Sequence, residues 1–416
     1  MESKVIVVRA DNEPIAGVIN PGSHQVYRNP WVSVETRELG TLHPHKIRVA
    51  MLYSGVCGTD MHVVTTNPQT GYIRCSAPLD LPPDGRIIGH EGVARVLAVG
   101  EEVRHVEPGA FVTFESIIVC HFCDACRRGH FNQCQRAKLL GLEKDGLFGT
   151  VVDVPSLLTH EVTDLAARDD GLRAATCVEP AAVAYLACRN AHVSGGDAVV
   201  IFGAGPIGLF SAILCKHVFG ASSVTIVEPI ARRRELARRW CDAVYDVEEY
   251  FQNLPCAIDT RLSCCIDVVI EASGELSNVE RVFRCLNENS RVALLARSGV
   301  PLTLTSVDHM ITNGITLVGS RGHLCGAFGD VLRLYRSGRM PLDEIVTEVA
   351  EGTDGLASLL TSPKQVEENN CKVLARLHSV EETETLVAGS RKKVFAVVWK
   401  ENNGSRIQTP VRVNGR

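Results

Sequence analysis

The feature that most constrains the fold of this chain is a glycine-rich segment between two apolar runs. The first run, 198–202, leads into Gly203-Ala204-Gly205-Pro206-Ile207-Gly208, a helix-compatible segment follows to about Phe219, and the second run, 224–227, ends on Glu228. In this arrangement the first glycine permits a tight turn, the second leaves room for a pyrophosphate and the third lets helix and strand approach closely. The segment therefore predicts a βαβ unit that binds a dinucleotide at the helix N-terminus, and the alternative is a glycine-rich turn in another α/β sheet. The predicted cofactor-binding residues are Gly203, Gly205, Pro206, Ile207, Gly208 and Glu228.

The segments that follow continue an alternation of strands and helices. A helix is predicted at 231–240, and strands are predicted at 267–271, 291–295 and 315–319. Such short βα spacing favours a parallel sheet with helices on both faces. After about His323 the pattern changes to a helix from about 330 to 335 and mixed segments ending at 372–377 and 394–399, followed from Lys400 by a polar tail that we expect to be frayed. Before the glycine-rich segment, the clearest strands are 5–8 and 45–51.

Length and charge restrict the class of protein. The 416 residues are enough for two domains, and a net charge of −5, with 43 basic and 48 acidic residues, favours neither nucleic acid nor an anionic membrane as a partner. The most apolar window, 198–215, is broken by three glycines and a proline, so no membrane span is expected. The N-terminus lacks the apolar core of a signal peptide, which predicts a cytoplasmic protein whose 16 cysteines are ligands and buried thiols rather than disulfides.

Four cysteines in a short segment predict a structural zinc site. Cys120, Cys123, Cys126 and Cys134 have the spacing C-x2-C-x2-C-x7-C. Four thiolates close a tetrahedral zinc site and leave no open position for a substrate. The alternative is an iron–sulfur cluster, but the ferredoxin pattern needs a shorter last gap and a proline where Gln135 stands.

A second group of residues predicts a catalytic metal. Cys57, Thr59, Asp60 and His62 fall within six residues, and the sequence Gly89-His90-Glu91 places a histidine 33 residues after Cys57. A thiolate, an imidazole and a carboxylate suit zinc with one position left for a substrate oxygen. Taken alone, Cys57 reads as a buried small residue and His90 as a core histidine, and their joint occurrence favours the metal site.

Two further features near this group leave alternatives open. Glu179, in the sequence Val178-Glu179-Pro180, is a candidate ligand, directly or through water, and Cys177 competes with it. The segment 65–86 is rich in proline, glycine, threonine and aspartate, so it forms either the rim of a substrate pocket or a surface excursion.

In this order, the motifs resemble the zinc-dependent medium-chain dehydrogenase/reductase family, and most closely its sorbitol, threonine and glucose dehydrogenase branch. The resemblance covers roughly residues 30–380 and implies an α/β chain of two domains. A GroES-like, mainly β catalytic domain would comprise 1–181 and 323–416, with the structural zinc lobe at about 115–140. A Rossmann domain with a doubly wound parallel sheet would comprise 182–322. The family also implies a homo-oligomer, either a dimer or a tetramer.

The resemblance assigns roles to the candidate residues. Cys57 and His90 would bind the catalytic zinc, and Glu91 would bind it directly or contact its ligands. Glu179 takes the place that holds a second cysteine in many alcohol dehydrogenases. Thr59 would contact the substrate oxygen, and His62, with a pKa expected near neutrality, would pass the proton to solvent.

The implied activity is transfer of a hydride between NAD and a secondary alcohol of a polyol, sugar, cyclitol or amino alcohol, giving a ketone. The alternatives are an NAD(P)-dependent reductase of small aldehydes and a non-catalytic nucleotide-binding member of the family. Glu228 favours NAD because a carboxylate accepts a hydrogen bond from the ribose 2′-OH, whereas Arg232, Arg233 and Arg234 favour NADP unless they form a solvated helix face. The segment 65–86 and the extension past Leu377 depart from the family pattern. Because of the long segment 65–86, the resemblance does not identify the substrate.

Overall fold

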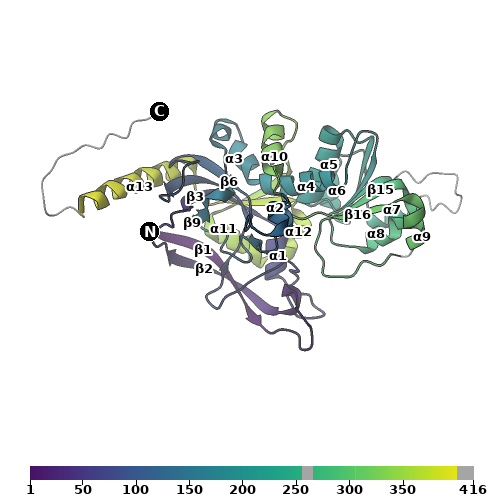
Figure 1. Cartoon of the computed structure of the whole chain (residues 1–416), viewed down its shortest axis with the longest axis horizontal. Helices are drawn as coiled ribbons and strands as arrows, with labels where there is room; N and C mark the ends of the chain where they lie inside the picture. The colour runs from purple at the N-terminus through teal and green to yellow at the C-terminus, as the bar shows by residue number, and fades with distance from the viewer. Residues whose placement is uncertain (255–265, 305, 401–416) are drawn as a thin grey trace.

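The computed structural model describes residues 1–254, 266–304 and 306–400. Most of its strands belong to two large β-sheets, one mainly antiparallel and one parallel. In Figure 1 the mainly β part lies to the left, and the parallel sheet with its helices lies to the right. The expected polar tail after Lys400 lies outside the described residues, and the apolar segment 394–399 lies in the helix α13 (Val380–Lys400).

The right-hand sheet has six parallel strands in the order β13-β12-β11-β14-β15-β16, which is the order typical of dinucleotide-binding folds. Its central strands are buried on both faces, as expected for near-continuous apolar runs. The strands are β11 (Ala198–Phe202), β12 (Ser223–Val227), β13 (Ala243–Tyr245), β14 (Ile266–Glu271), β15 (Leu286–Leu294) and β16 (Thr316–Gly319). The strands predicted from the sequence in this region are confirmed.

Helices alternate with these strands. The helix predicted after the glycine motif is α5, which a π-helical turn extends to Phe219, and the helix predicted at 231–240 is confirmed as α6 but ends at Ala237. The helices of this part are α4 (Val178–Asn190), α5 (Pro206–Leu214), α6 (Ala231–Ala237), α7 (Val247–Asn253), α8 (Ser277–Val282), α9 (Val307–Asn313) and α10 (Ala327–Arg336).

The left-hand sheet has seven strands in the order β10-β6-β5-β3-β18-β17, with β9 also paired to β3. Strand β18 runs antiparallel to β3 although more than 300 residues separate them, so the end of the chain returns to the sheet that its beginning forms. The strands are β3 (Lys46–Val56), β5 (Glu91–Val99), β6 (Phe111–Phe114), β9 (Val151–Pro155), β10 (Thr159–Glu161), β17 (Val346–Glu351) and β18 (Lys372–Arg376).

Smaller elements complete this part. One sheet joins β2, β1 and β4, and β7 pairs with β8 beside the four cysteines. These strands are β1 (Glu2–Asn12), β2 (Tyr27–Glu38), β4 (Arg86–Ile87), β7 (Ile117–Ile118) and β8 (Lys138–Leu139). The helices are α1 (Gly58–Val64), α2 (Asp124–Arg127), α3 (Gly171–Thr176), α11 (Gly352–Thr361), α12 (Pro363–Asn369) and the terminal α13.

The largest hydrophobic cluster joins the two parts. It includes Leu52 and Leu374 of the mainly β sheet, Ala181 of α4, and Ile201 and Val268 of the parallel sheet. Sheet membership changes between β10 and β11 and again between β16 and β17. We therefore retain the domain limits 1–181 with 323–416, and 182–322, as a proposal.

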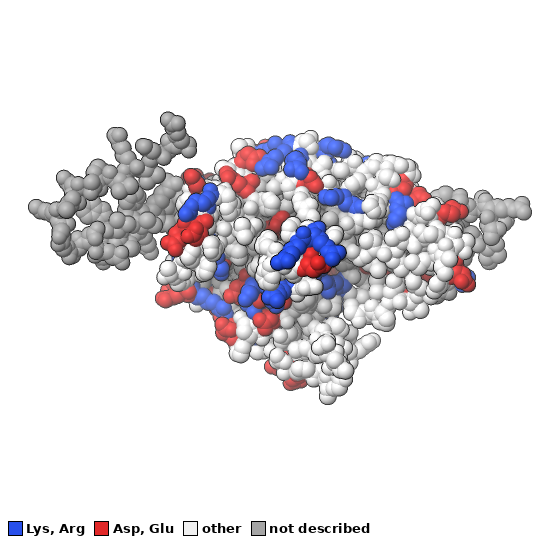
Figure 2. All heavy atoms as spheres, in the orientation of Figure 1, with Lys and Arg blue, Asp and Glu red and all other residues white. Residues whose placement is uncertain are grey.

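The surface carries both charges. On the face that Figure 2 shows, acidic and basic side chains are interspersed. Within the described ranges, no helix has the length and hydropathy that a membrane crossing requires.

Candidate active site and zinc lobe

Pairing of β3 with β5 brings the predicted catalytic ligands together. Gly55 lies opposite Glu91 in this antiparallel pair, so Cys57, just beyond β3, comes close to His90, just before β5. One ligand atom from each of Cys57, His90 and Glu91 lies within 4.8 Å of the other two. The sequence prediction that these three residues meet is therefore matched by the geometry.

Asp60 connects two of these residues, a role that the sequence analysis did not assign to it. Its carboxylate is fully buried, accepts a hydrogen bond from the Cys57 backbone N–H at 2.9 Å, and lies 3.6 Å from His90 Nδ1. Burial opposes protonation of His90, but the negative charges of Asp60 and Cys57 raise its pKa well above the ordinary value. A carboxylate on Nδ1 leaves Nε2 for a metal, as in many zinc sites.

Lys372 is a second residue that the sequence analysis did not single out. Its ammonium group is fully buried on β18, donates to Glu91 Oε2, and donates to the Val56 carbonyl oxygen at 2.9 Å. Burial lowers the pKa of Lys372, but Glu91 and Cys57 outweigh burial and raise it, so the lysine is charged. No pattern of spacing points to a lysine 281 residues away from its partner.

The donor set fits a zinc ion. Glu91 Oε1 is buried and has no hydrogen-bond partner among the described residues. A buried oxygen without a partner is costly unless something binds it. Thiolate, imidazole and carboxylate are the groups that zinc prefers.

Glu179 lies beside these three residues, but its carboxylate contacts Ser116 and His323. Its Oε1 accepts a hydrogen bond from Ser116 Oγ at 3.2 Å and lies 3.2 Å from His323 Nε2. Burial opposes ionisation of Glu179, but the His323 imidazole lowers its pKa to about 2. Glu179 lines the cavity described next, whereas Cys177 is fully buried, does not line it, and has a pKa that burial raises to about 12. The geometry thus favours Glu179 over Cys177 as the group that faces a bound metal.

A cavity of about 890 Å³ lies between the two sheets. It is lined by Cys57, Thr59, His62, His90, Glu91 and Glu179 from one side and by Gly205, Pro206 and Ile207 from the other. The segment 65–86 contributes Asn67, Thr70 and residues 73–77 to its wall. Of the two readings of this segment, the structure therefore favours the pocket rim.

Thr59 and His62 lie on one face of α1, three residues apart, and both border the cavity. The expectation of a near-neutral pKa for His62 is wrong. Burial, with a smaller effect of the positive charge of Arg74, lowers the pKa of His62 to about 4. The imidazole is therefore neutral at physiological pH and able to accept a proton.

The glycine motif has the geometry that its sequence predicts. Gly203 has φ +97°, in the region that favours glycine, and a Cβ on Gly208 would lie 1.9 Å from the Gly203 carbonyl oxygen. A Cβ on Gly205 would meet nothing within 4 Å, so the space in front of the α5 N-terminus is open. These features match a phosphate-binding turn.

Glu228 lies below this turn. Its carboxylate is buried and accepts hydrogen bonds from the backbone N–H groups of Ala204, at 2.6 Å, and Ile230, at 2.9 Å. It braces the turn and is not among the residues that line the cavity, so its contact with a ribose stays a prediction. Of the three arginines, Arg233 lines the cavity, and Arg234 donates to the Glu228 carbonyl oxygen.

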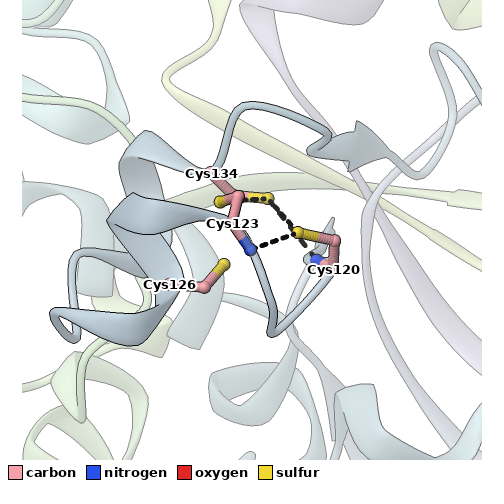
Figure 3. Close-up of side chains that lie close together, drawn as sticks. All are labelled: Cys120, Cys123, Cys126 and Cys134. Atoms are coloured by element: carbon pink, nitrogen blue, oxygen red, sulfur yellow. Dashed lines mark hydrogen bonds between the residues drawn. The ribbon is translucent and has the colours of Figure 1, made fainter.

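The four cysteines of the zinc lobe converge, as Figure 3 shows. Their sulfur atoms all lie within 4.8 Å of one another, with 3.6 Å between Cys120 and Cys134 and 3.9 Å between Cys123 and Cys134. Two sulfurs on one tetrahedral zinc are about 3.8 Å apart, given Zn–S bonds of about 2.3 Å. Backbone N–H groups of Cys126 and Gln135 lower the pKa of Cys123 to about 6, which favours a thiolate. The lobe is therefore shaped for a closed zinc site.

The chain can now be compared with known proteins. Residues 43–164 match the alcohol dehydrogenase GroES-like domain, and residues 206–337 match the zinc-binding dehydrogenase domain. L-threonine 3-dehydrogenase of Pyrococcus horikoshii is 31% identical over 313 residues, which cover 75% of this chain and 86% of that protein. The chain belongs to the zinc-dependent medium-chain dehydrogenase family.

A second sequence relative and a solved structure agree with this assignment. Scyllo-inosose 3-dehydrogenase of Thermotoga maritima is 32% identical to this dehydrogenase over 344 residues, covering 78% of this chain and 85% of that one. A solved structure from Thermotoga maritima, assigned as an alcohol dehydrogenase, superposes with a TM-score of 0.79 at 27% identity and covers 90% of this chain and all of its own. The resemblance and the fold class expected from the sequence are confirmed.

Proposed function

We propose that this dehydrogenase oxidises a secondary alcohol to a ketone with NAD, at a zinc ion held by Cys57, His90 and Glu91. The proposal rests on one observation: these three ligand atoms converge on a cavity that the glycine turn also lines. The zinc would supply Lewis acidity that lowers the pKa of the alcohol, and the nicotinamide would accept the hydride.

Residues of the chain would transfer the proton and position the metal ligands. Thr59 borders the cavity next to Cys57, where its hydroxyl can hold the proton of a substrate hydroxyl. His62, one turn further along α1, is neutral and can take that proton toward solvent. Asp60 and Lys372 fix His90 and Glu91, and Glu179 faces the metal directly or through water. The cavity walls hold the two reactants together and exclude water.

The substrate classes of similar proteins support a hydroxyl next to further polar groups. One relative is named for threonine, an amino alcohol, and the other for scyllo-inosose, a cyclitol. The complete donor set argues against a non-catalytic member of the family. A panel of polyols, cyclitols and amino alcohols against small aldehydes separates the proposed activity from an aldehyde reductase.

NAD is the proposed cofactor. A Glu228 carboxylate that contacted the ribose would accept a hydrogen bond from the 2′-OH and disfavour a 2′-phosphate, whereas Arg233, which lines the cavity, would favour a phosphate. A kcat/KM for NADP equal to or above that for NAD would contradict this preference. A cytoplasmic location and assembly into a dimer or tetramer also remain proposals, and light scattering tests the second.

Substitution of a metal ligand tests the proposed function. We expect Cys57→Ala and His90→Ala to lower kcat/KM by at least about 10³-fold, because a Lewis acid contributes several kcal/mol to the transition state. Metal analysis should show two zinc ions per wild-type chain and one per variant, with unchanged circular dichroism. Full turnover in either variant, with one zinc ion per chain, would refute the assignment.

A further inference from the structure

Three arginines that line the cavity have no side-chain partner among the described residues. Arg74, Arg297 and Arg321 all line it, and none of them makes a hydrogen bond or ion pair through its side chain with any residue in the described part of the chain. Elsewhere in this protein, arginines such as Arg48 and Arg291 pair with half-buried carboxylates at 2.7 and 2.5 Å. Guanidinium groups without carboxylates are suited to bind an anion from outside the chain.

The acidic residues of the cavity do not balance these charges. Glu91 is paired with Lys372, and Glu179 is paired with His323. Among the described residues that line the cavity, only one further acid remains, Glu367 on α12, and α12 packs against α6 at the nucleotide end. The rest of the cavity therefore has an excess of positive charge, and its walls focus that charge on a bound ligand.

The three arginines reach the cavity from both sides. Arg74 lies on the segment 65–86, where the backbone N–H of Cys75 donates to the His62 carbonyl oxygen at 3.0 Å and fixes this segment to α1. Arg297 follows β15, and Arg321 follows β16, at the carboxyl ends of neighbouring strands. Burial and the nearby charge of Arg321 lower the pKa of Arg297, and the thiol of Cys75 acts in the opposite direction. The two strand ends thus face the segment that carries Arg74.

The phosphates of the cofactor are not the natural partner of this group. They are expected at the N-terminus of α5, which follows β11. In the sheet, β14 separates β15 from β11, so the end of β15 is about 10 Å from that of β11, and β16 is about 14 Å away. Arg74 lies instead close enough to His62 for its positive charge to lower the pKa of that imidazole, at the catalytic end of the cavity.

We propose that the alcohol oxidised by this enzyme carries an anionic group, a phosphate or a carboxylate, and that Arg74, Arg297 and Arg321 bind it. This inference rests on the proposed function and specifies its substrate class. The hydroxyl to be oxidised would face Thr59 while the anion is held at the rim, which fixes the orientation of the substrate.

Binding to the zinc-loaded enzyme in complex with NADH tests the site without turnover. Inorganic phosphate and acetate, followed by NADH fluorescence, should bind the complex, while glycerol should bind at least ten-fold more weakly. Arg297→Gln should weaken phosphate binding at least ten-fold with an unchanged Kd for NADH. Arg284→Gln, at an exposed arginine outside the cavity that also has no partner among the described residues, is the matched control.

Several results would overturn the proposal. One is absence of binding by both anions, and another is phosphate binding that is insensitive to Arg74→Gln and Arg297→Gln, which would place it on the zinc. A third is competition of phosphate with NADH, or a raised Kd for NADH in Arg297→Gln, which would assign the arginines to the cofactor.

Turnover distinguishes the two kinds of anion and separates this proposal from the proposed function. D-glucitol, D-glucitol 6-phosphate and D-gluconate share a six-carbon chain, and the better anionic compound should exceed D-glucitol in kcat/KM by at least ten-fold. Arg297→Gln should remove that advantage, whereas Arg284→Gln, outside the cavity, should leave kcat/KM for all three compounds unchanged. Anion binding without oxidation of any alcohol would refute the proposed function and leave only an anion-binding site, whereas oxidation with a preference for D-glucitol would refute the anionic substrate alone.

Discussion

At the scale of single residues, the site depends on side chains whose neighbours change their chemistry. His62 is the clearest case, because an isolated histidine titrates near pH 6.5 and this one has a pKa of about 4. The structure places His62 on the same face of α1 as Thr59, and the burial that lowers its pKa is a property of the folded chain. The role of His62 in the proton relay therefore stays a prediction, and the prediction of its near-neutral pKa is wrong.

The low pKa of His62 has a consequence for stability. The unfolded chain binds a proton at His62 below about pH 6.5, whereas the folded chain does not until about pH 4, so stability falls as the pH falls through this window. The slope from this residue is at most about 1.4 kcal/mol per pH unit. We expect urea unfolding at pH 7, 6 and 5 to show a steeper loss in the wild type than in His62→Gln. Parallel losses in the two proteins would show that His62 titrates normally.

At the scale of elements, the sequence predicted what depends on local pattern. The strands of the parallel sheet are apolar along their whole length because both faces are covered, and the glycine motif fixes where α5 begins. Strand β1 is longer than the predicted 5–8, and β2 was not predicted, because exposed positions along these strands weaken the apolar pattern. The sequence analysis assigned no role to Asp60, because its partner His90 lies on a distant segment of the chain.

Two glycines of one turn should fail in different ways. A Cβ at Gly208 would overlap the Gly203 carbonyl oxygen, so Gly208→Ala should cost about 2 to 3 kcal/mol of unfolding free energy. A Cβ at Gly205 meets open space, so Gly205→Ala should fold normally but bind NADH at least ten-fold more weakly. Chemical denaturation and NADH titration measure the two effects. Equal stability of both variants would contradict the close approach at Gly208.

The zinc lobe should contribute stability rather than chemistry. Cys123→Ala removes one of four converging thiolates, so we expect one zinc ion per chain in place of two and a lower Tm. Turnover at low temperature should persist, because the lobe cysteines do not line the cavity. Cys241→Ala, at a half-buried cysteine outside both clusters, is the control. If the Cys123→Ala variant kept two zinc ions per chain, the four cysteines would not be a zinc site.

At the scale of the whole molecule, the end of the chain completes a site that its beginning starts. The motifs in the sequence indicated a catalytic domain interrupted by a nucleotide-binding domain, and β18 returns to β3 as that order requires. What the motifs did not indicate is that β18 carries Lys372 into the core and that His323 reaches Glu179. Contacts of this kind depend on tertiary packing, and no sequence motif links Lys372 to Glu91 or His323 to Glu179.

The buried pair of Lys372 and Glu91 makes the return of the chain testable. Lys372→Met would leave the Glu91 carboxylate buried without its counter-charge, and breaking a buried pair in this way costs about 3 to 5 kcal/mol. The double variant Glu91→Gln with Lys372→Met removes both charges, so it should unfold less easily than the single variant. Denaturant unfolding at pH 7 gives both free energies. If the double variant were the less stable of the two, Lys372 would not be neutralising the charge of Glu91. The contact between the beginning and the end of the chain would then be stabilised by the β3–β18 strand pairing alone.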